Sequence, residues 1–267
     1  NPHEVITSML GKALSQEYPK EQVKIGERLL TCKNVVAGSQ VRNLSFTVHE
    51  GEIVGIAGLV GAGKSELARV LFGADPLTSG EVYKRGKKLK CTSPKVAVDE
   101  GIALIPEERR REGIMAEESV AVNLTMTTLH NYSRFGFLRS LLVNEAVKGL
   151  IQALQIKVAN PQLPIGSLSG GNQQKVVIGK WLATEADIFI LDEPTKGVDV
   201  GAKSEIYRII GNLAKNGKGI VYLSCEFEEL VGIADRILVM YDGSFVKELS
   251  RSQATVETIM YYASGGQ

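Results

Sequence analysis

GLVGAGKS, the stretch from Gly58 to Ser65, decides the fold of this 267-residue chain. It matches the pattern G-x-x-x-x-G-K-[ST] at every fixed position and follows the apolar run Ile53 to Ala57, which predicts a buried strand. Glycines let the backbone curl until successive N–H groups face one anion, and the helix that follows adds the positive end of its dipole. The stretch therefore predicts a strand, a phosphate-binding loop and a helix; the alternative is a glycine-rich turn without a ligand.

The loop and the first residues of its helix are the first candidate nucleotide contacts. Lys64 is expected to reach the β- and γ-phosphates of a triphosphate, and the Ser65 hydroxyl is expected to bind Mg²⁺. The full predicted set is Gly58, Leu59, Val60, Gly61, Ala62, Gly63, Lys64, Ser65 and Glu66.

A second candidate site lies in DIFILDEPT, from Asp187 to Thr195. An apolar run that ends in two carboxylates is typical of a buried parallel strand with acids at its carboxyl end. Asp192 is predicted to hold Mg²⁺ through water, and Glu193 to polarise a water molecule toward the γ-phosphate. The alternative makes these two acids a helix cap and a surface charge before Pro194.

A third candidate site is LSGGNQQK, from Leu168 to Lys175, which predicts a glycine-rich helix start just before the acidic strand. Free N–H groups and the helix dipole at such a start favour an anion, and that phosphate need not belong to the same domain. The predicted contacts are Ser169, Gly170, Gly171, Asn172 and Gln173.

Along the chain the three motifs follow one another as GLVGAGKS, LSGGNQQK and DIFILDEPT, and in this order they resemble those of ATP-binding cassette proteins. LSGGNQQK, the segment KGVDVGAK from Lys196 to Lys203, and the opening GEIVGIAGLVGAGKSE are similar to the C-terminal half of the tandem ATPase of bacterial ribose-, galactose- or xylose-type importers. The resemblance covers the chain from about Leu29 to its end. It implies ATP and Mg²⁺ as ligands, and a P-loop NTPase fold with ATP hydrolysis coupled to sugar import.

The resemblance also implies partners. Two cassettes meet head to tail, so the signature motif of each closes the ATP site of the other. The second cassette is expected to be the N-terminal half of the same tandem protein, or another copy when this domain is isolated. A membrane permease and, indirectly, a periplasmic sugar-binding protein complete the expected assembly, at the cytoplasmic face of the inner membrane with the cassette peripheral to it.

Two positions depart from the usual pattern of the family. The glutamine that follows the strand 102–105 in most cassettes, where it contacts the Mg²⁺ shell, corresponds to Glu107, which can approach the metal but cannot donate a hydrogen bond. The usual histidine that donates to the γ-phosphate corresponds to Cys225, a weak donor that often packs as a small hydrophobe. We therefore expect Glu107 and Cys225 in the catalytic site, with slow hydrolysis there.

The predicted architecture is α/β, with a mostly parallel core sheet, an antiparallel β subdomain and an inserted helical subdomain. Residues 1–28 are expected to be the tail of a preceding domain and a linker, although a helix native to this domain is the alternative for 5–14. Residues 29–267 form the predicted nucleotide-binding domain, with the helical subdomain at about 107–167. Strands are expected at 29–36, 44–49, 53–57, 102–105, 188–192, 219–224 and 236–240, a hairpin at 80–91, and helices at 120–129, 142–156, 172–183, 202–214 and 256–262.

Composition narrows the function further. A net charge of +1 provides no global field that would attract nucleic acid, and Cys32, Cys91 and Cys225 are too far apart for a C-x-x-C site. No apolar run approaches the length that spans a bilayer. Alternatives that stay open are a tandem cassette ATPase outside transport and a nucleotide-binding half with little hydrolysis of its own.

Overall fold

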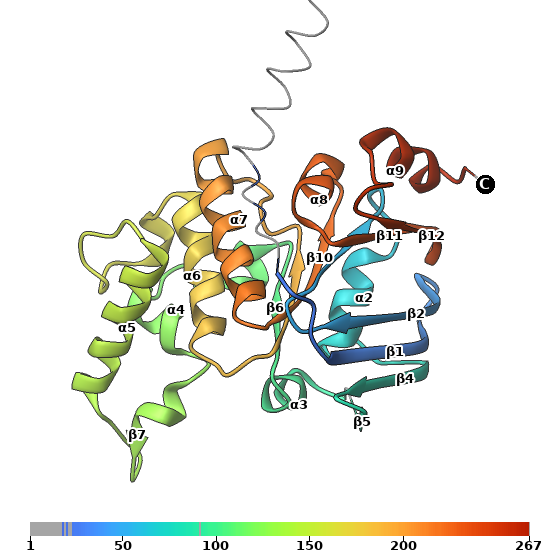
Figure 1. Cartoon of the computed structure of the whole chain (residues 1–267). Coiled ribbons are helices and arrows are strands. Elements are labelled where there is room, and N and C mark those ends of the chain that lie inside the picture. Colours follow the sequence, from blue (N-terminus) through green and yellow to red (C-terminus); the bar gives the residue numbers. More distant parts are fainter. Residues whose placement is uncertain (1–17, 19, 21–22, 91, 267) are drawn as a thin grey trace, which may run out of the picture.

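The computed structural model describes Tyr18, Lys20, residues 23–90 and residues 92–266. A six-stranded sheet, in the order β12-β11-β3-β10-β9-β6, and a four-stranded sheet, in the order β2-β1-β4-β5, form the body of the protein (Figure 1). The expected helix at 5–14 lies outside the described residues. The strands are β1 Arg28–Ala37, β2 Val41–His49, β3 Ile53–Ala57, β4 Ser79–Lys84, β5 Lys87–Leu89, β6 Ile102–Ile105, β7 Ser133–Arg134, β8 Phe137–Leu138, β9 Ile188–Asp192, β10 Gly219–Ser224, β11 Arg236–Tyr241 and β12 Ser244–Ser250.

The six-stranded sheet is parallel except for β12, which pairs antiparallel with β11 at the edge. Every residue of β3, β9 and β10 is buried, because helices and the second sheet cover both faces of these central strands. The register sets Ala57 opposite Ser224 and Leu223 opposite Asp192. The residues that follow these three strands therefore meet at one edge of the sheet, which confirms the predicted mostly parallel core.

The four-stranded sheet is antiparallel throughout, as predicted. Its strand β2 approximately alternates buried and exposed residues, the pattern of a strand with one face in the core and one in water. The predicted hairpin is formed by β4 and β5, with Arg85 and Gly86 in left-handed conformations at its turn. The antiparallel β subdomain lies beside the core sheet at the lower right of Figure 1.

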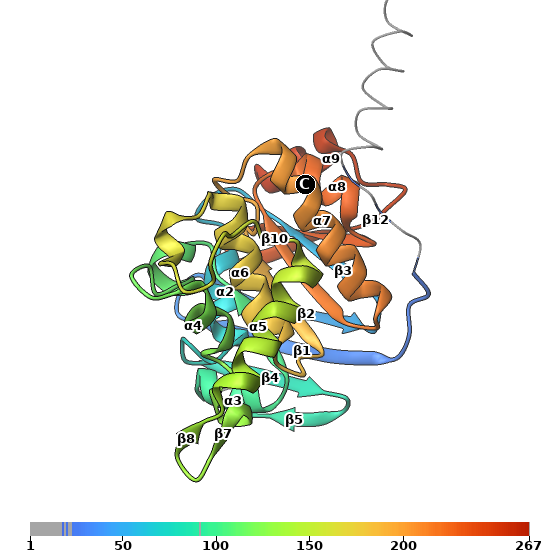
Figure 2. The same cartoon turned by 90° about the vertical axis from the view of Figure 1, so that its left-hand side faces the viewer.

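Helices cover the core sheet and form the region between β6 and α6. Helices α4, α5 and α6 pack together; they lie at the left of Figure 1 and face the viewer in Figure 2, as expected for an inserted helical subdomain. None of the described helices is long and apolar enough to cross a bilayer. The helices are α2 Lys64–Leu71, α3 Pro94–Asp99, the π-helix η1 Arg109–Gly113, α4 Val120–Thr125, the 3₁₀ helix η2 Leu129–Tyr132, α5 Ser140–Leu154, the 3₁₀ helix η3 Ile165–Ser167, α6 Gly170–Leu182, α7 Val200–Lys215, α8 Phe227–Ile233 and α9 Val256–Ala263.

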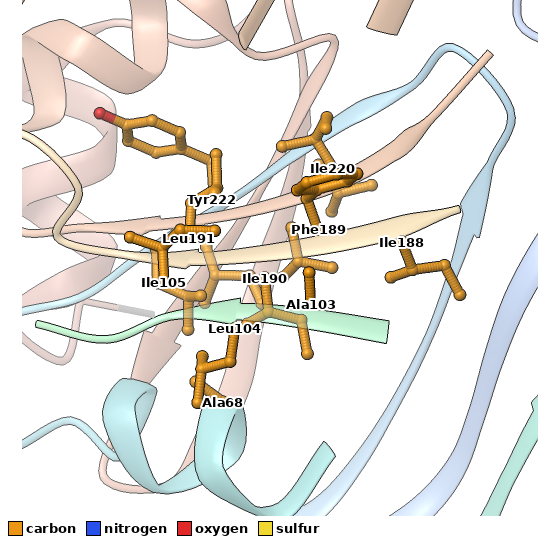
Figure 3. Packing of buried hydrophobic residues seen from close by; sticks show 14 of the residues in the cluster. Ala68, Ala103, Leu104, Ile105, Ile188, Phe189, Ile190, Leu191, Ile220 and Tyr222 are labelled. Atoms are coloured by element: carbon orange, nitrogen blue, oxygen red, sulfur yellow. The ribbon is translucent and has the colours of Figure 1, made fainter. Parts of the chain in front are cut away.

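The centre of the core is the contact between β6, β9 and β10. Branched and aromatic side chains such as Ile105, Phe189 and Ile190 pack there with Ala68 of α2, as Figure 3 shows. Burying each large apolar side chain contributes about 1.5–3 kcal/mol to folding. The hydroxyl of Tyr222 points away from this apolar cluster.

Two elements near the end of the chain were not predicted. Helix α8 has only seven residues, so its apolar periodicity is too short to recognise. Strand β12 is mostly exposed and joins β11 through Asp242 and Gly243, both at positive φ as a tight hairpin turn requires. The Asp-Gly pair was the available signal for this hairpin.

Candidate active site

The phosphate-binding loop lies between β3 and α2, and its shape depends on two glycines in left-handed conformations. Gly61 has a φ of 83° and Gly63 a φ of 101°. A Cβ at Gly63 would lie 2.1 Å from the carbonyl oxygen of Gln40, so only glycine fits there. The N–H groups of Val60, Gly61 and Gly63 donate to no carbonyl among the described residues. The loop therefore has the conformation and the free donors that a phosphate requires.

Lys64 begins α2, and its side chain turns back over the loop. Its Nζ donates to the carbonyl oxygens of Gly58 at 2.9 Å and Leu59 at 3.3 Å. The same ammonium lies 3.1 Å from Cys225 Sγ and 3.7 Å from Glu193 Oε1. Lys64 thus joins the loop to the two residues predicted to act at the γ-phosphate.

Asp192, at the end of β9, has a buried carboxylate oxygen, Oδ1, with no hydrogen-bond partner in the described part of the chain. Burial is the main cause that raises the pKa of Asp192 to about 7, with smaller contributions from the carboxylates of Glu107 and Glu193, while a hydrogen bond from Ser65 opposes the shift. A cation beside this oxygen would remove the penalty. The residues present therefore fit Mg²⁺, which prefers oxygen ligands.

Glu107 lies beside the same oxygen atoms. The Ser65 hydroxyl donates to its Oε2 at 3.1 Å, while Lys196 Nζ binds its Oε1 at 2.6 Å. The hydrogen bond from Lys196 is the main cause that lowers the pKa of Glu107. No three His, Cys, Asp or Glu side chains in the described ranges gather to hold a metal by themselves, so a Mg²⁺ here would also need phosphate or water oxygens.

Glu193 follows Asp192 with its backbone in the left-handed region, at a φ of 45°. Its Oε1 accepts the backbone N–H of Cys225 at 2.7 Å, and its Oε2 accepts the hydroxyl of Ser224 at 3.3 Å. These contacts fix the carboxylate at the end of β10. Left-handed backbone at a residue other than glycine is uncommon and concentrates at functional sites.

Cys225 is half-buried between Lys64 and Glu193. Burial is the main cause that raises the pKa of its thiol, and the hydrogen bond with Glu193 adds to the shift. The thiol is therefore neutral near pH 7 and a poor nucleophile. The structure places Cys225 beside Lys64 and Glu193, and a neutral thiol there is a weak hydrogen-bond donor.

The signature residues form the start of α6, whose helix begins at Gly170, two residues before the predicted start. Ser169 is exposed, and its Oγ accepts a hydrogen bond from Asn172 Nδ2 at 3.0 Å. A Cβ at Gly171 would lie 2.4 Å from the Cβ of Ala202 on α7, so this glycine allows the two helices to approach closely. No hydrogen bond or ion pair among the described residues joins Ser169 or Asn172 to the phosphate-binding loop.

Gln173 differs from the other predicted signature contacts. Its side chain is buried, its Nε2 donates to the carbonyl of Leu168 at 3.0 Å, and its backbone N–H donates to Ser169 within the helix start. Neither group is displayed to a ligand in this structure. The position indicates that Gln173 supports the loop before α6. The sequence pattern of the helix start could not distinguish this structural role from a contact with a ligand.

Lys196 and Arg109 were not predicted as parts of this site. Arg109 Nη1 and Nη2 donate to the carbonyls of Lys196 at 2.6 Å and Gly197 at 3.2 Å, and Lys196 in turn binds Glu107. The segment after β6 is thus tied twice to the turn after β9. The sequence signal for Lys196 was its position four residues after the acidic strand ends at Asp192.

The sequence of this chain is similar to those of import ATP-binding proteins. The chain is 42% identical over 266 residues to the ribose import ATP-binding protein RbsA of Geobacillus kaustophilus, covering 100% of this chain and 54% of that protein. It is 45% identical over 264 residues to RbsA of Rhodococcus jostii, covering 99% and 52%. A putative ribose/galactose/methyl galactoside import ATP-binding protein of Rhizobium etli is 42% identical over 265 residues, covering 99% and 51%. The chain thus spans about half the length of these relatives.

Solved structures show the same fold at lower sequence identity. A nucleotide-free ATP-binding cassette from an ABC transporter superimposes with a TM-score of 0.75 at 22% identity, covering 88% of this chain and 95% of that one. A dimeric cassette in a post-hydrolysis state bound to ADP and Pi gives 0.71 at 22% identity, covering 84% and 99%. The ABC transporter family profile matches residues 41–196. With this match over more than half of its length and relatives above 40% identity along nearly all of it, the chain belongs to the ABC transporter family, as an ATPase domain.

Proposed function

We propose that this chain binds MgATP and hydrolyses it as the C-terminal cassette of a tandem ATPase that energises sugar import through a membrane permease. The observation that carries the proposal is the convergence of Lys64, Glu193 and Cys225 at one edge of the core sheet, beside the unpartnered buried oxygen of Asp192. The proposed role in sugar import is supported by the names of the similar proteins, which are ribose or ribose/galactose/methyl galactoside import ATP-binding proteins.

In this proposal the loop from Gly58 to Ser65 holds the phosphates with its N–H groups and with Lys64. Ser65 and Asp192 hold Mg²⁺, with Glu107 beside them. The metal, when bound, offsets the charge of the phosphate oxygens. Glu193 orients the attacking water and accepts its proton, because its carboxylate is held on Cys225 N–H and Ser224 and cannot turn away.

Hydrolysis at this site is proposed to be slow. Glu107 accepts from Ser65 and Lys196 where the amide of a glutamine could donate, and the neutral thiol of Cys225 is a weak donor toward a phosphate. Losing one charge-assisted hydrogen bond costs about 1.5–3 kcal/mol, which corresponds to about one to two powers of ten in rate. The exposed signature at Ser169 then serves mainly to complete the site of the partner cassette.

The proposed assembly contains a second cassette, a permease and, outside the membrane, a sugar-binding protein, with this chain peripheral at the cytoplasmic face. A solved dimeric cassette of the same fold supports the pairing of cassettes. The second candidate function is a nucleotide-binding half that does not hydrolyse ATP, which is favoured by the absence of a strong hydrogen-bond donor in the side chains of Glu107 and Cys225. ATP binding without turnover at this site, with the other cassette present, would establish it.

The test compares two variants in the full tandem transporter reconstituted with its permease. Glu193→Gln removes the base of this site, and Ser169→Glu places a carboxylate where a phosphate of the partner site is proposed to bind. Ser169 is exposed, so the second change leaves the packing of this domain intact, whereas a side chain at Gly171 would collide with α7.

We expect Ser169→Glu to abolish transport and Glu193→Gln to reduce it only in part. Ser167→Glu, at an equally exposed residue at the end of η3, is the matched control and should transport normally. Equal loss of transport from Glu193→Gln and Ser169→Glu would contradict the division of labour between the two sites.

A further inference from the structure

A buried carboxylate outside the phosphate-binding loop accepts hydrogen bonds from three parts of the fold. Glu229 on α8 is 1% exposed. Its two oxygens share the single hydroxyl proton of Thr195, whose oxygen lies 2.7 and 2.8 Å from them, and it accepts the hydroxyl of Tyr222 at 2.6 Å. The hydroxyl of Tyr207 donates at 2.7 Å, and Lys203 Nζ lies at 2.9 Å. We call these five residues the Glu229 cluster.

The cluster lies where α7 and α8 pack on β10. Tyr222 belongs to β10, and its hydroxyl, which points away from the apolar cluster in Figure 3, donates to Glu229. Lys203 and Tyr207 come from α7, and Thr195 from the turn after β9. The carboxylate is therefore the common acceptor of a strand, a helix and a turn, which it holds in one arrangement.

Glu229 is ionised in this setting. Burial alone would raise the pKa of its carboxyl, but the donors from Tyr222, Thr195, Tyr207 and Lys203 outweigh burial and lower it. A buried carboxylate whose oxygens all accept hydrogen bonds is held firmly in place, because any movement would break the bonds that compensate its buried charge. The Glu229 cluster can therefore hold the chain segments that contribute its residues in fixed positions.

Two segments of the active site are attached to the cluster. Thr195 lies two residues after Glu193, and the turn between them is closed by a hydrogen bond from Lys196 N to the carbonyl of Glu193 at 3.0 Å. Glu229 itself lies on the helix that starts two residues after Cys225. The bond from Thr195 to Glu229 therefore ties together the segments that carry Glu193 and Cys225, whose own contact is the 2.7 Å bond from Cys225 N to Glu193 Oε1.

We infer that Glu229 is a positioning residue for hydrolysis, acting through Thr195 to hold the Glu193 carboxylate on the N–H of Cys225. The left-handed backbone at Glu193 persists because the cluster fixes the turn that follows it. Without the bond between Thr195 and Glu229, that turn can relax and the carboxylate leaves its orientation. The inference rests on the proposed ATP hydrolysis at this site.

The test compares Thr195→Val, which keeps the shape but removes the hydroxyl, with Thr195→Ser, which keeps the hydroxyl. Tyr207→Phe is the matched control, because it removes one donor from the same carboxylate on the α7 side without touching the turn after Glu193. All are made in the full tandem ATPase in which the other cassette has lost its own catalytic carboxylate, so that only this site turns over.

For Thr195→Val we expect kcat to fall about 10-fold to 100-fold, because small misplacements of catalytic groups cost that much. The dissociation constant of ATP should stay within about twofold, since the phosphate-binding loop is untouched. Thr195→Ser should recover most of the lost kcat. Tyr207→Phe should keep kcat within about twofold, even where its melting temperature falls as far as that of Thr195→Val. Equal losses of kcat in Thr195→Val and Tyr207→Phe would reduce the cluster to a structural role and overturn the inference.

A second measurement does not depend on turnover. The amide proton of Cys225 is bonded to a carboxylate, so Thr195→Val should move its NMR resonance upfield and speed its exchange with solvent, whereas Tyr207→Phe should not. If the wild-type site binds ATP without turnover, the proposed hydrolysis fails, and this measurement still decides whether Glu229 positions Glu193. An unchanged Cys225 amide in Thr195→Val would overturn the inference by itself.

Discussion

Lys196 forms an ion pair with Glu107, with 2.6 Å between Nζ and Oε1, and so connects the turn after β9 to the segment after β6. The two residues are 89 positions apart, and Glu107 also accepts the hydroxyl of Ser65 at its other carboxylate oxygen. Because Lys196 donates a hydrogen bond to one carboxylate oxygen of Glu107 and Ser65 donates to the other, both oxygens act as acceptors. Glu107 thus accepts hydrogen bonds at the position where, in most cassettes, the amide of a glutamine can donate one.

Replacing Glu107 by Gln should therefore raise hydrolysis at this site. The amide keeps the size of the side chain and adds a donor, while the lost ion pair, half exposed at Lys196, contributes at most about 1 kcal/mol to folding. Phosphate release by the site-isolated tandem ATPase measures the effect. Glu108→Gln, which removes the longer contact of 3.4 Å to Lys196, is the control and should change neither rate nor melting temperature. A slower Glu107→Gln enzyme would show that the carboxylate itself is needed.

Gly63→Ala should abolish ATP binding and destabilise the fold. The new Cβ would collide with the carbonyl of Gln40 at 2.1 Å, and the residue would have to keep a φ of 101°. Gly61→Ala is the matched change: its φ is also positive, at 83°, but nothing lies within 4 Å of the new Cβ. We expect Gly61→Ala to cost about 1 kcal/mol of unfolding free energy from backbone strain and Gly63→Ala at least twice that. Urea unfolding and nucleotide titration check both, and similar costs for the two variants would contradict the role of Gln40.

Gly171→Ala should separate α6 from α7. Its Cβ would lie 2.4 Å from that of Ala202, which overpacks the contact and costs about 1–3 kcal/mol. Ala202→Gly alone should cost about 1 kcal/mol as a glycine in a helix, but it should rescue Gly171→Ala. A double-mutant cycle of unfolding free energies measures this coupling, and additive effects would mean that the two positions are not in contact.

The burial of Lys180 should make the unfolding free energy of the protein depend on pH. Lys180 is buried in α6, its Nζ donates to the carbonyl of Gly113 at 2.6 Å, and burial lowers its pKa from 10.5 to about 8. Below pH 8 the folded protein carries this buried charge at a cost of about 3 kcal/mol. Between pH 8 and 10.5 the unfolded chain binds more protons than the folded one, so the contribution of Lys180 to stability improves as pH rises.

Lys180→Met removes that titration while keeping the shape. Relative to this variant, the wild-type protein should gain unfolding free energy between pH 8 and 10.5 and show a constant difference below pH 7. Lys180→Met also loses the hydrogen bond to Gly113 and the contact with the ring of Trp181. At pH 7 its unfolding free energy should therefore exceed that of the wild type by only about 1–2 kcal/mol. Parallel pH profiles for the two proteins would refute the prediction.

Much of the fold was predictable from the sequence because its signals are local. A buried parallel strand such as β10 is an unbroken apolar run, and its predicted bounds, 219–224, match the structure. The hairpin of β4 and β5, the core strands and the helix after the signature also depend on residues a few positions apart. Helix α8 and strand β12 were not predicted, because a seven-residue helix and a mostly exposed edge strand show too little hydrophobic periodicity.

By itself the sequence determined the phosphate-binding loop, the acidic strand and the signature, since a backbone that curls around an anion needs particular residues in consecutive positions. The tertiary structure alone decided which side chains surround these motifs. Lys196 on Glu107, Cys225 on Glu193 and Thr195 on Glu229 join residues 32 to 89 positions apart. Such pairs form only when the register of β9 and β10 and the packing of α7 and α8 have brought their strands and helices together, and no local pattern records that outcome.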